Sequence, residues 1–379
     1  MKAKLFLFFS AAFSFACSND VVVPMPVLQD NVTYDTHPKN KEYQSELSNY
    51  RNTTNSPGAV LLVYLPSEPL WIGSLGKSNL AHNAPMYTNS QFRTGSVTKM
   101  LTATVILMLM EKNKLTLEDK LVEHLPEVAG KIPGADKISI RHLLGHLSGI
   151  FDPPNESLRY QADLINNPAA MYSMPMEDIL EEYVFGKNLH FTPGAGYSYS
   201  NTNYWLLGMI AERISHRTIQ ELMEEMIFIP LQMSNTYIES RDDSKVARGY
   251  ADLYNNGVLL DVSLWDRAEG DGGADGGLIS TADDLFKFMT GLFNGKLISP
   301  TTLKEMKKIQ WSSCNTPECE YGLGLEIWRT EAGIAYGHNG GLVGIEANVL
   351  YYENFGGISV LYKNNGNGSD KNWLGKLIK

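Results

Sequence analysis

Ser96 and Lys99 are the residues of this chain whose types and spacing most directly suggest chemistry. On a helix, side chains three residues apart share one face, so the hydroxyl and the amine come within hydrogen-bonding reach. A serine hydroxyl becomes nucleophilic when a neighbouring base takes its proton, and a lysine can be that base if burial and positive potential keep it neutral. The apolar run from Met100 to Met110 predicts a buried helix with Ser96 at its amino end, where the helix dipole adds positive potential. The pair therefore predicts an activated serine.

Two later segments add further polar side chains. Tyr199 and Asn201 follow a turn-rich stretch that can present a phenol and an amide side by side, so that Tyr199 relays a proton while Asn201 holds substrate. Further along the chain, His338 is followed by Gly340 and Gly341, and glycines let the backbone of a strand approach a ligand closely. A basic side chain beside such a backbone suits an anion and an oxyanion.

Each of these residues also has a purely structural interpretation. Tyr199 fits an ordinary half-buried aromatic residue, and Asn201 fits the N-cap of a helix that begins at the next residue or the one after it. His338 alone fits a surface or core histidine, and the glycines that follow it fit a turn or a bulge. The order and spacing of the whole set favour a catalytic site over these separate interpretations.

The three motifs, Ser-x-x-Lys, Tyr-x-Asn and His-x-Gly in this order, resemble those of the serine β-lactamase and penicillin-binding family. The resemblance covers roughly residues 58–363 and is to the class C β-lactamase-like branch, which includes D-alanyl-D-alanine carboxypeptidases, D-aminopeptidases and esterases. The β-lactamases of that branch usually carry Lys-Thr-Gly as the third motif. Here His338 and Asn339 replace the lysine and the threonine, so the peptidases and esterases match better than the β-lactamases do.

The resemblance implies that Ser96 attacks an acyl carbonyl and forms an acyl-enzyme, which water then hydrolyses. Lys99 and Tyr199 would share the proton transfers, and either of them can be the base. The backbone N–H groups of Ser96 and Gly341 match the family's oxyanion-hole positions. This chemistry requires neither a metal nor an organic cofactor.

The same resemblance implies the substrate-binding residues. Asn201 would orient the substrate amide, and His338, with Gly340 beside it, would meet the terminal carboxylate of the substrate. The expected function is an exported serine hydrolase that acts on a D-amino-acid peptide or a related amide or ester, most of all a D-alanyl-D-alanine carboxypeptidase. The alternatives are a β-lactamase or an esterase of the same family, and a penicillin-binding sensor or binding protein with weak catalysis.

The elements that must position these residues predict an α+β fold. The chain is rich in strand patterns at both ends and in helix patterns in the middle, which predicts an antiparallel sheet flanked by helices, a mainly helical lobe, and a site in the cleft between them. Thr116 and Thr218 open capping-box patterns, and Asn256-Gly257 predicts a hairpin. The predicted segments are a signal peptide (1–16), an N-terminal tether (17–57) that contains one helix over residues 40–51, and a hydrolase domain (58–379) with an α/β lobe (58–115 and 281–379) and a helical lobe (116–280).

The amino terminus predicts export. Lys2 and Lys4 precede an apolar stretch, residues 5–16, which has the length of a signal-peptide core and is too short to span a bilayer. The segment that ends at Cys17 resembles a bacterial lipobox, which would make Cys17 the lipidated first residue of a cell-envelope lipoprotein facing the periplasm or the surface. The alternative is ordinary cleavage nearby and a soluble periplasmic protein.

In an oxidising compartment, the remaining cysteines, Cys314 and Cys319, predict a local disulfide, with two free thiols as the alternative. His142 and His146 lie four residues apart on a predicted helix, but no cysteine or carboxylate accompanies them at ligand spacing, so no metal site is expected.

The charge of the chain limits its partners. The formal net charge is −10, which argues against nucleic acid and against an anionic membrane surface. The expected partner is a small-molecule or peptide substrate, including peptides derived from peptidoglycan. Membrane contact is expected only through a lipid at Cys17.

Overall fold

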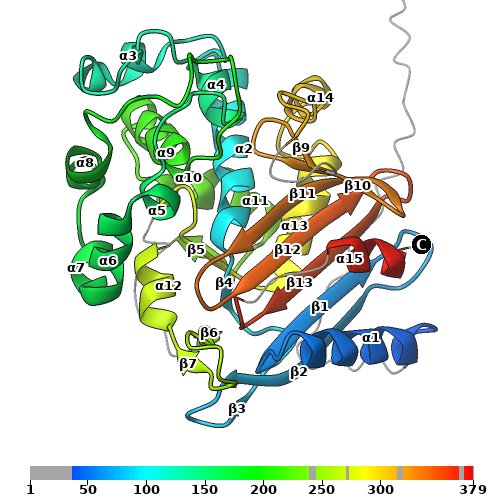
Figure 1. Cartoon of the computed structure of the whole chain (residues 1–379). Helices are drawn as coiled ribbons and strands as arrows, with labels where there is room; N and C mark the ends of the chain where they lie inside the picture. Colours follow the sequence, from blue (N-terminus) through cyan, green and yellow to red (C-terminus); the bar gives the residue numbers. More distant parts are fainter. Residues whose placement is uncertain (1–35, 239–244, 270–272, 314–318, 367–370, 379) are drawn as a thin grey trace, which may run out of the picture.

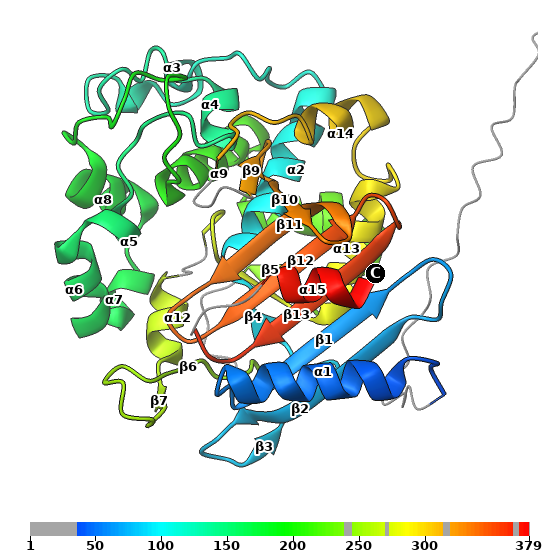
Figure 2. The same ribbon diagram turned by 45° about the vertical axis from the view of Figure 1, so that its right-hand side comes forward.

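The computed structural model describes residues 36–238, 245–269, 273–313, 319–366 and 371–378. Within these ranges, a large antiparallel sheet carries helices on both faces and lies beside a mainly helical region (Figures 1 and 2). The predicted α+β class and the predicted antiparallel sheet are confirmed.

Both ends of the chain build this sheet, whose strand order is β3-β2-β1-β13-β12-β11-β10-β9. The first long strand lies antiparallel to the last one, with Ala59 opposite Lys363. Strands from opposite ends of the sequence are thereby neighbours. The strands are β1 (Gly58–Tyr64), β2 (Trp71–Asn79), β3 (Ala84–Pro85), β9 (Cys319–Tyr321), β10 (Glu326–Thr330), β11 (Gly333–Gly341), β12 (Glu346–Tyr352) and β13 (Gly357–Lys363).

The sheet is buried on both faces, because side chains that alternate along β1 pack into two different cores. Val60 and Leu62 belong to the core shared with helices α2 (Thr98–Glu111) and α13 (Ala282–Phe293). The alternate side chains, Ala59, Leu61 and Val63, belong to the core shared with α1 (Asn40–Thr53) and α15 (Lys371–Ile378).

Helix α1 confirms the helix predicted over residues 40–51 within the tether segment (17–57). Its Tyr43, Leu47 and Tyr50 are buried against the sheet, so residues 40–53 are part of the folded domain. These three residues follow the spacing of one helix face, as an amphipathic helix that packs on the sheet requires. The predicted signal peptide (1–16) and Cys17 lie outside the described residues.

The helical region lies to one side of the sheet (Figure 1). Ser139 and Thr218 form capping boxes at the starts of α4 and α10, the latter as predicted. The expected helix start after Thr116 is wrong, because Asp119 accepts from the Thr116 N–H and closes a turn there. The helices are α3 (Leu121–His124), α4 (Ile140–Leu144), α5 (Pro153–Glu156), α6 (Leu158–Asn166), α7 (Pro168–Tyr172), α8 (Met176–Ile179), α9 (Asn201–Ser215), α10 (Ile219–Met223) and α11 (Ile229–Leu231).

A small sheet has the strand order β4-β8-β5, and the predicted hairpin around Asn256-Gly257 is present with strands of only two residues each, β6 and β7. None of the described helices has both the length and the apolar character needed to span a bilayer. The remaining elements are β4 (Phe92–Arg93), β5 (Tyr237–Ile238), β6 (Tyr250–Ala251), β7 (Leu260–Asp261), β8 (Leu278–Ser280), α12 (Ser263–Glu269) and α14 (Pro300–Met306).

Candidate active site

Ser96 lies in a single 3-10 turn, Gly95–Val97, that leads directly into α2. Lys99 follows one helical turn later, is fully buried, and its Nζ lies 3.0 Å from Ser96 Oγ. Gly95 has φ +53°, and a Cβ there would come within 3.0 Å of the Gly341 backbone nitrogen. The turn therefore needs glycine both for its left-handed backbone and for its contact with β11.

Lys99 Nζ is also held by two carbonyl oxygens. It lies 2.7 Å from Asn201 Oδ1 and 2.9 Å from the backbone oxygen of Asp275. Both oxygens can only accept, so a neutral amine would use its two protons on them and turn its lone pair toward Ser96. The charged form would instead donate its third proton to Ser96. The geometry therefore suits a lysine that alternates between the two forms.

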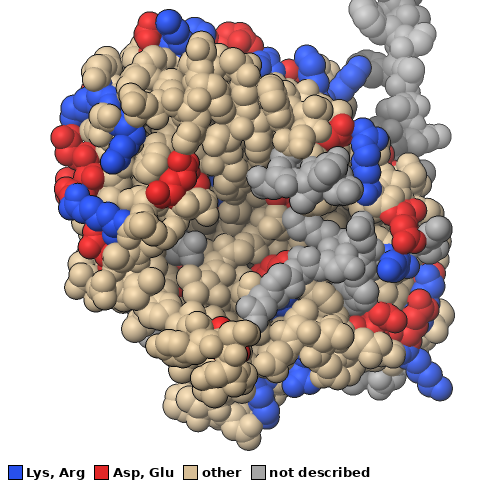
Figure 3. Space-filling view, in the orientation of Figure 1, with Lys and Arg blue, Asp and Glu red and all other residues tan. Residues whose placement is uncertain are grey.

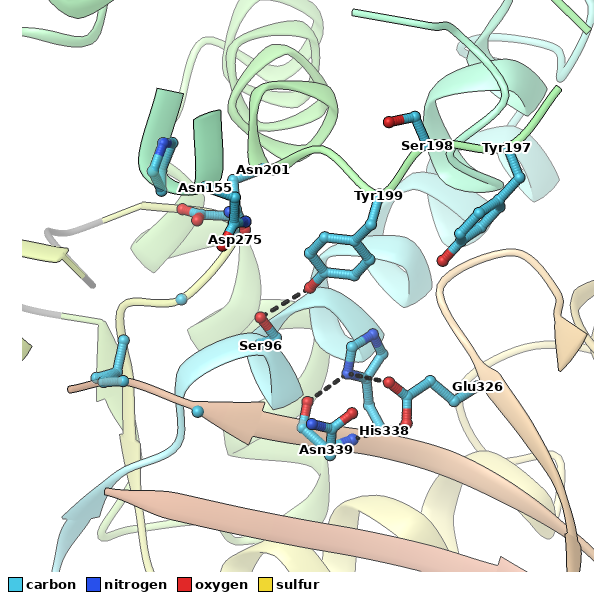
Figure 4. Close-up of a pocket in the computed structure, with 14 residues that line it drawn as sticks. Ser96, Asn155, Tyr197, Ser198, Tyr199, Asn201, Asp275, Glu326, His338 and Asn339 are labelled. Atoms are coloured by element: carbon cyan, nitrogen blue, oxygen red, sulfur yellow. Dashed lines mark hydrogen bonds and ion pairs between the residues drawn. The ribbon is translucent and has the colours of Figure 1, made fainter. Parts of the chain in front are cut away.

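Tyr199 reaches Ser96 from the helical region. Its hydroxyl donates to Ser96 Oγ at 2.8 Å, as Figure 4 shows. Burial raises the pKa of Tyr199 well above its usual value, and the negative charge of Glu326 adds to this shift. Tyr199 is therefore a phenol in the resting site, although Lys99 Nζ lies 5.0 Å from the centre of its ring.

Asn201 is the first residue of α9, and the N-cap position belongs to Ser200, so Asn201 is not the helix cap considered above. Its amide nitrogen and its backbone N–H both donate to Asp152 Oδ1, at 3.2 and 3.0 Å. Asp152 was not predicted. It precedes two prolines at the start of α5, where an aspartate would be interpreted as an N-cap, but no cap hydrogen bond from its side chain is present.

His338 lies on β11 with its side chain only 1% exposed. Its Nδ1 lies 2.6 Å from the Asn339 carbonyl oxygen, which can only accept, so this nitrogen carries a proton. Its Nε2 lies 2.9 Å from the Tyr321 hydroxyl. Both ring nitrogens thus face protein atoms, and the predicted contact with a substrate carboxylate stays a prediction.

Gly340 and Gly341 bring β11 against the Ser96 turn. A Cβ at Gly340 would lie 1.7 Å from the backbone oxygen of Thr94 and 3.1 Å from the Ser96 nitrogen, so no larger residue fits. A Cβ at Gly341 would meet nothing within 4 Å. The two amides predicted for the oxyanion hole, those of Ser96 and Gly341, therefore come from segments in close backbone contact.

A buried histidine, His146, packs against Tyr199 and the start of α9. The ring centre of His146 lies 4.2 Å from that of Tyr199, and its Nδ1 lies 3.1 Å from the backbone nitrogen of Ser200. Burial lowers the pKa of His146 well below its usual value, so the ring is neutral. His146 was considered for a metal site, but within the described ranges no group of three or more His, Cys, Asp or Glu side chains could hold a metal ion.

The predicted residues Ser96, Tyr199, Asn201, His338 and Gly341 line one cavity of about 570 Å³. The face of the molecule is hollowed between the helical region and the sheet (Figure 3). Sequence reasoning missed part of the lining, which includes Pro154, Asn155, Tyr197, Ser198, Asp275, Gly276, Glu326, Asn339 and Leu342.

The predicted disulfide lies partly outside the described residues, because Cys314 is not among them. Cys319 begins β9, is buried and is disulfide-bonded. The pairing with Cys314 stays a prediction.

Comparison with known proteins shows which family has this fold and these motifs. A family model described as Beta-lactamase matches residues 44–373. Penicillin-binding protein 4* of Bacillus subtilis (strain 168) is 29% identical over 298 residues, which are 75% of this chain and 62% of that protein. This chain thus spans less than two thirds of that relative.

Two solved structures extend the comparison over nearly the whole chain. A D-stereospecific amidohydrolase from Streptomyces sp. superposes with a TM-score of 0.77 at 27% identity, covering 88% of this chain and 98% of that one. The D-amino acid amidase from Ochrobactrum anthropi SV3 superposes with a TM-score of 0.70 at 25% identity, covering 88% of this chain and 96% of that one.

Proposed function

Because this chain belongs to the Beta-lactamase family and because a buried lysine and a phenol both contact one serine hydroxyl, we propose that it is a serine hydrolase that forms an acyl-enzyme at Ser96. The observation that carries the proposal is the convergence of Lys99 Nζ at 3.0 Å and the Tyr199 hydroxyl at 2.8 Å on Ser96 Oγ. An activated nucleophile needs such an arrangement of acid and base.

Of the two candidate bases that the sequence leaves open, we propose Lys99. The raised pKa of Tyr199 keeps the phenol protonated, so Tyr199 cannot begin the reaction by taking a proton. In its neutral form, Lys99 accepts the Ser96 proton while its own two protons stay on the carbonyl oxygens of Asn201 and Asp275. Tyr199 then relays a proton to the leaving group, which an amine needs in order to depart.

The oxyanion that forms on the substrate would be stabilised by the backbone N–H groups of Ser96 and Gly341. Donors of this kind contribute on the order of 3 kcal/mol to the transition state. The close packing of Gly340 on the Ser96 turn supports this role, because it fixes the two amides relative to each other. Water then releases the acyl group and restores Ser96.

The proposed substrates are D-amino-acid peptides and related amides or esters. The solved relatives that support this choice are a D-stereospecific amidohydrolase and a D-amino acid amidase. The carboxypeptidase reaction on D-alanyl-D-alanine, which the resemblance favours, belongs to the same class. For the location we propose export and a lipid anchor at Cys17, on the basis of the leader sequence alone.

The test is to incubate the full chain and its Ser96→Ala variant with four substrate classes: a muropeptide, a D-peptide or D-amino-acid amide, a β-lactam and an ester. We expect hydrolysis of the D-amide or the ester and a mass adduct on Ser96, both absent in Ser96→Ala. Hydrolysis that survives in Ser96→Ala would disprove the proposal. Binding of substrates without any turnover in the wild type would favour the binding or sensor protein.

A further inference from the structure

His146, which the proposed mechanism does not use, lies just after the end of α4. Its φ is +58°, a left-handed backbone that residues other than glycine rarely adopt. The backbone N–H groups of this residue and the next one donate to the carbonyl oxygens of Leu143 and His142, a helix end at which glycine is the usual residue. The side chain is fully buried, and among the described residues nothing hydrogen-bonds to its Nε2. Both features cost free energy, and a residue kept in spite of such a cost is a candidate for a functional role.

His146 binds the chain on both sides of Tyr199. The backbone N–H of Ser198 donates to the His146 carbonyl oxygen at 3.1 Å, and the backbone N–H of Ser200 donates to the imidazole Nδ1 at 3.1 Å. The imidazole ring also packs on the phenol ring, with ring centres 4.2 Å apart. One residue therefore holds Tyr199 through three contacts, two at the neighbouring backbone and one at the ring.

A buried network fixes the state of the imidazole. A backbone N–H can only donate, so Nδ1 accepts and the proton of the neutral ring lies on Nε2. Asn203 Nδ2 lies 3.1 Å from the same Nδ1 and donates to it, which turns Asn203 Oδ1 toward the Ser148 hydroxyl at 2.6 Å. Ser148 in turn accepts from the Ile150 N–H at 3.1 Å. These contacts need an unprotonated Nδ1, and burial together with the charge of Lys99 lowers the pKa of His146 well below its usual value.

Filling the core would explain the burial of His146 but not this set of contacts. A leucine would fill much of the same space, but it would leave the buried N–H of Ser200 without its acceptor. A glycine would suit the left-handed backbone, but it would leave a void beside the ring of Tyr199. Histidine supplies an acceptor and a flat ring together, and both of them act on Tyr199 or on its neighbour in the chain.

We propose that His146 is the positioning residue of Tyr199 and holds the phenol against Ser96 Oγ, the place from which it passes a proton to the leaving group. This inference rests on the proposed function, because it gives His146 a part in the same reaction. His146 is not among the residues that line the cavity, so it acts through Tyr199 and does not touch substrate. Loss of the His146 side chain should therefore have the kinetic pattern of loss of the Tyr199 hydroxyl.

The variants His146→Leu and His146→Asn separate the acceptor from the ring. Leucine removes the acceptor, whereas asparagine keeps an oxygen near the position of Nδ1 and tolerates the left-handed backbone. The matched control is His216→Asn, because His216 has φ +57° at the other end of α9 but is exposed and does not line the cavity. Thermal unfolding will verify that each protein folds.

On a D-amino-acid amide, His146→Leu should lower kcat by about tenfold to a hundredfold and change KM little, because a displaced phenol delivers its proton poorly. His146→Asn should lose less, about threefold to tenfold, and His216→Asn should match the wild type. On a p-nitrophenyl ester, whose leaving group departs without a proton, the losses of both His146 variants should shrink to about threefold or less. In a Tyr199→Phe background, His146→Leu should cause no further loss on the amide, because the phenol is already absent.

The positioning role is overturned if His146→Leu loses as much on the ester as on the amide, or if its loss multiplies with that of Tyr199→Phe. If His146→Leu does not fold, His146→Asn carries the same comparisons. A crystal structure of the folded variant gives a readout that needs no turnover: the Tyr199 hydroxyl should lie beyond hydrogen-bonding distance of Ser96 Oγ, and an unchanged position overturns the role. Lack of Ser96-dependent turnover in the wild type would count against the proposed function, and the crystal structure would still decide whether His146 positions Tyr199.

Discussion

The Asp152 carboxylate turns the side-chain amide of Asn201 so that its oxygen faces the reacting groups. Asp152 Oδ1 accepts from both nitrogens of Asn201, which directs Asn201 Oδ1 to Lys99 Nζ at 2.7 Å. With the amide reversed, an NH₂ group would face the lysine. Asp152 therefore acts on Lys99 through Asn201 and is a positioning residue.

The variant Asp152→Asn should lower kcat by about tenfold to a hundredfold and change KM little, because the amide of Asn201 loses its fixed orientation. Burial raises the pKa of Asp152 to about 6. We therefore expect an inflection near pH 6 on the acid side of the wild-type kcat profile, with activity rising as Asp152 ionises. The inflection should be absent in Asp152→Asn and present in the control Asp163→Asn, and identical profiles for wild type and Asp152→Asn would contradict this role.

Lys99→Met and Tyr199→Phe should separate the two proton-transfer roles. On an amide, each variant should lose about two to four decades in kcat/KM. On a p-nitrophenyl ester, whose leaving group departs without a proton, Tyr199→Phe should lose much less than Lys99→Met. The measurement is the rate of adduct formation on Ser96, followed by mass. Equal losses on both substrates for both variants would show that Lys99 alone is not the base.

Gly340→Ala should abolish most activity, whereas Gly341→Ala should retain it. A Cβ at Gly340 would lie 1.7 Å from the Thr94 oxygen, while one at Gly341 would meet nothing within 4 Å. The first change must move β11 away from the Ser96 turn, which separates the oxyanion amides, and loss of one such donor costs about a hundredfold to a thousandfold in kcat. Steady-state kinetics of the two variants on the ester test this, and similar kcat values for both would contradict it.

The raised pKa of Asp266 makes the free energy of unfolding depend on pH. Its carboxyl group is buried and accepts from the Gly344 N–H at 2.7 Å, and burial raises its pKa to about 7, although Arg93 partly offsets this shift. Because the folded state holds the proton more tightly than the unfolded chain does, this group stabilises the fold fully below about pH 4. That contribution is lost as pH rises through about 7.

Asp266→Asn keeps the acceptor for Gly344 and removes the titration. Relative to wild type, the variant should therefore gain free energy of unfolding as pH rises from 5 to 8, at about 1.4 kcal/mol for each pKa unit of the shift. Urea unfolding of both proteins at several pH values measures this difference, in which the other titrating groups, Asp261 and Arg248 among them, largely cancel. A difference that does not change with pH would refute the prediction.

The sequence by itself determined the features that depend on short spacing. Ser96 and Lys99 come together because they lie one turn apart, and the order of strand and helix patterns was enough for the α+β class and for a sheet built from both ends of the chain. The capping box at Thr218 and the hairpin at Asn256-Gly257 are equally local. The helix over residues 40–51 is local in the same way, whereas the burial of its Tyr43, Leu47 and Tyr50 against the sheet depends on the tertiary structure.

Only the tertiary structure decided which groups surround the serine. Asp152 reaches Asn201 across 49 residues, and the Asp275 carbonyl oxygen reaches Lys99 across 176. Glu326 enters the cavity because β10 pairs with β11 in one particular register. No local pattern marks such residues, because their protonation and orientation depend on burial and on partners that only the packing of distant elements supplies.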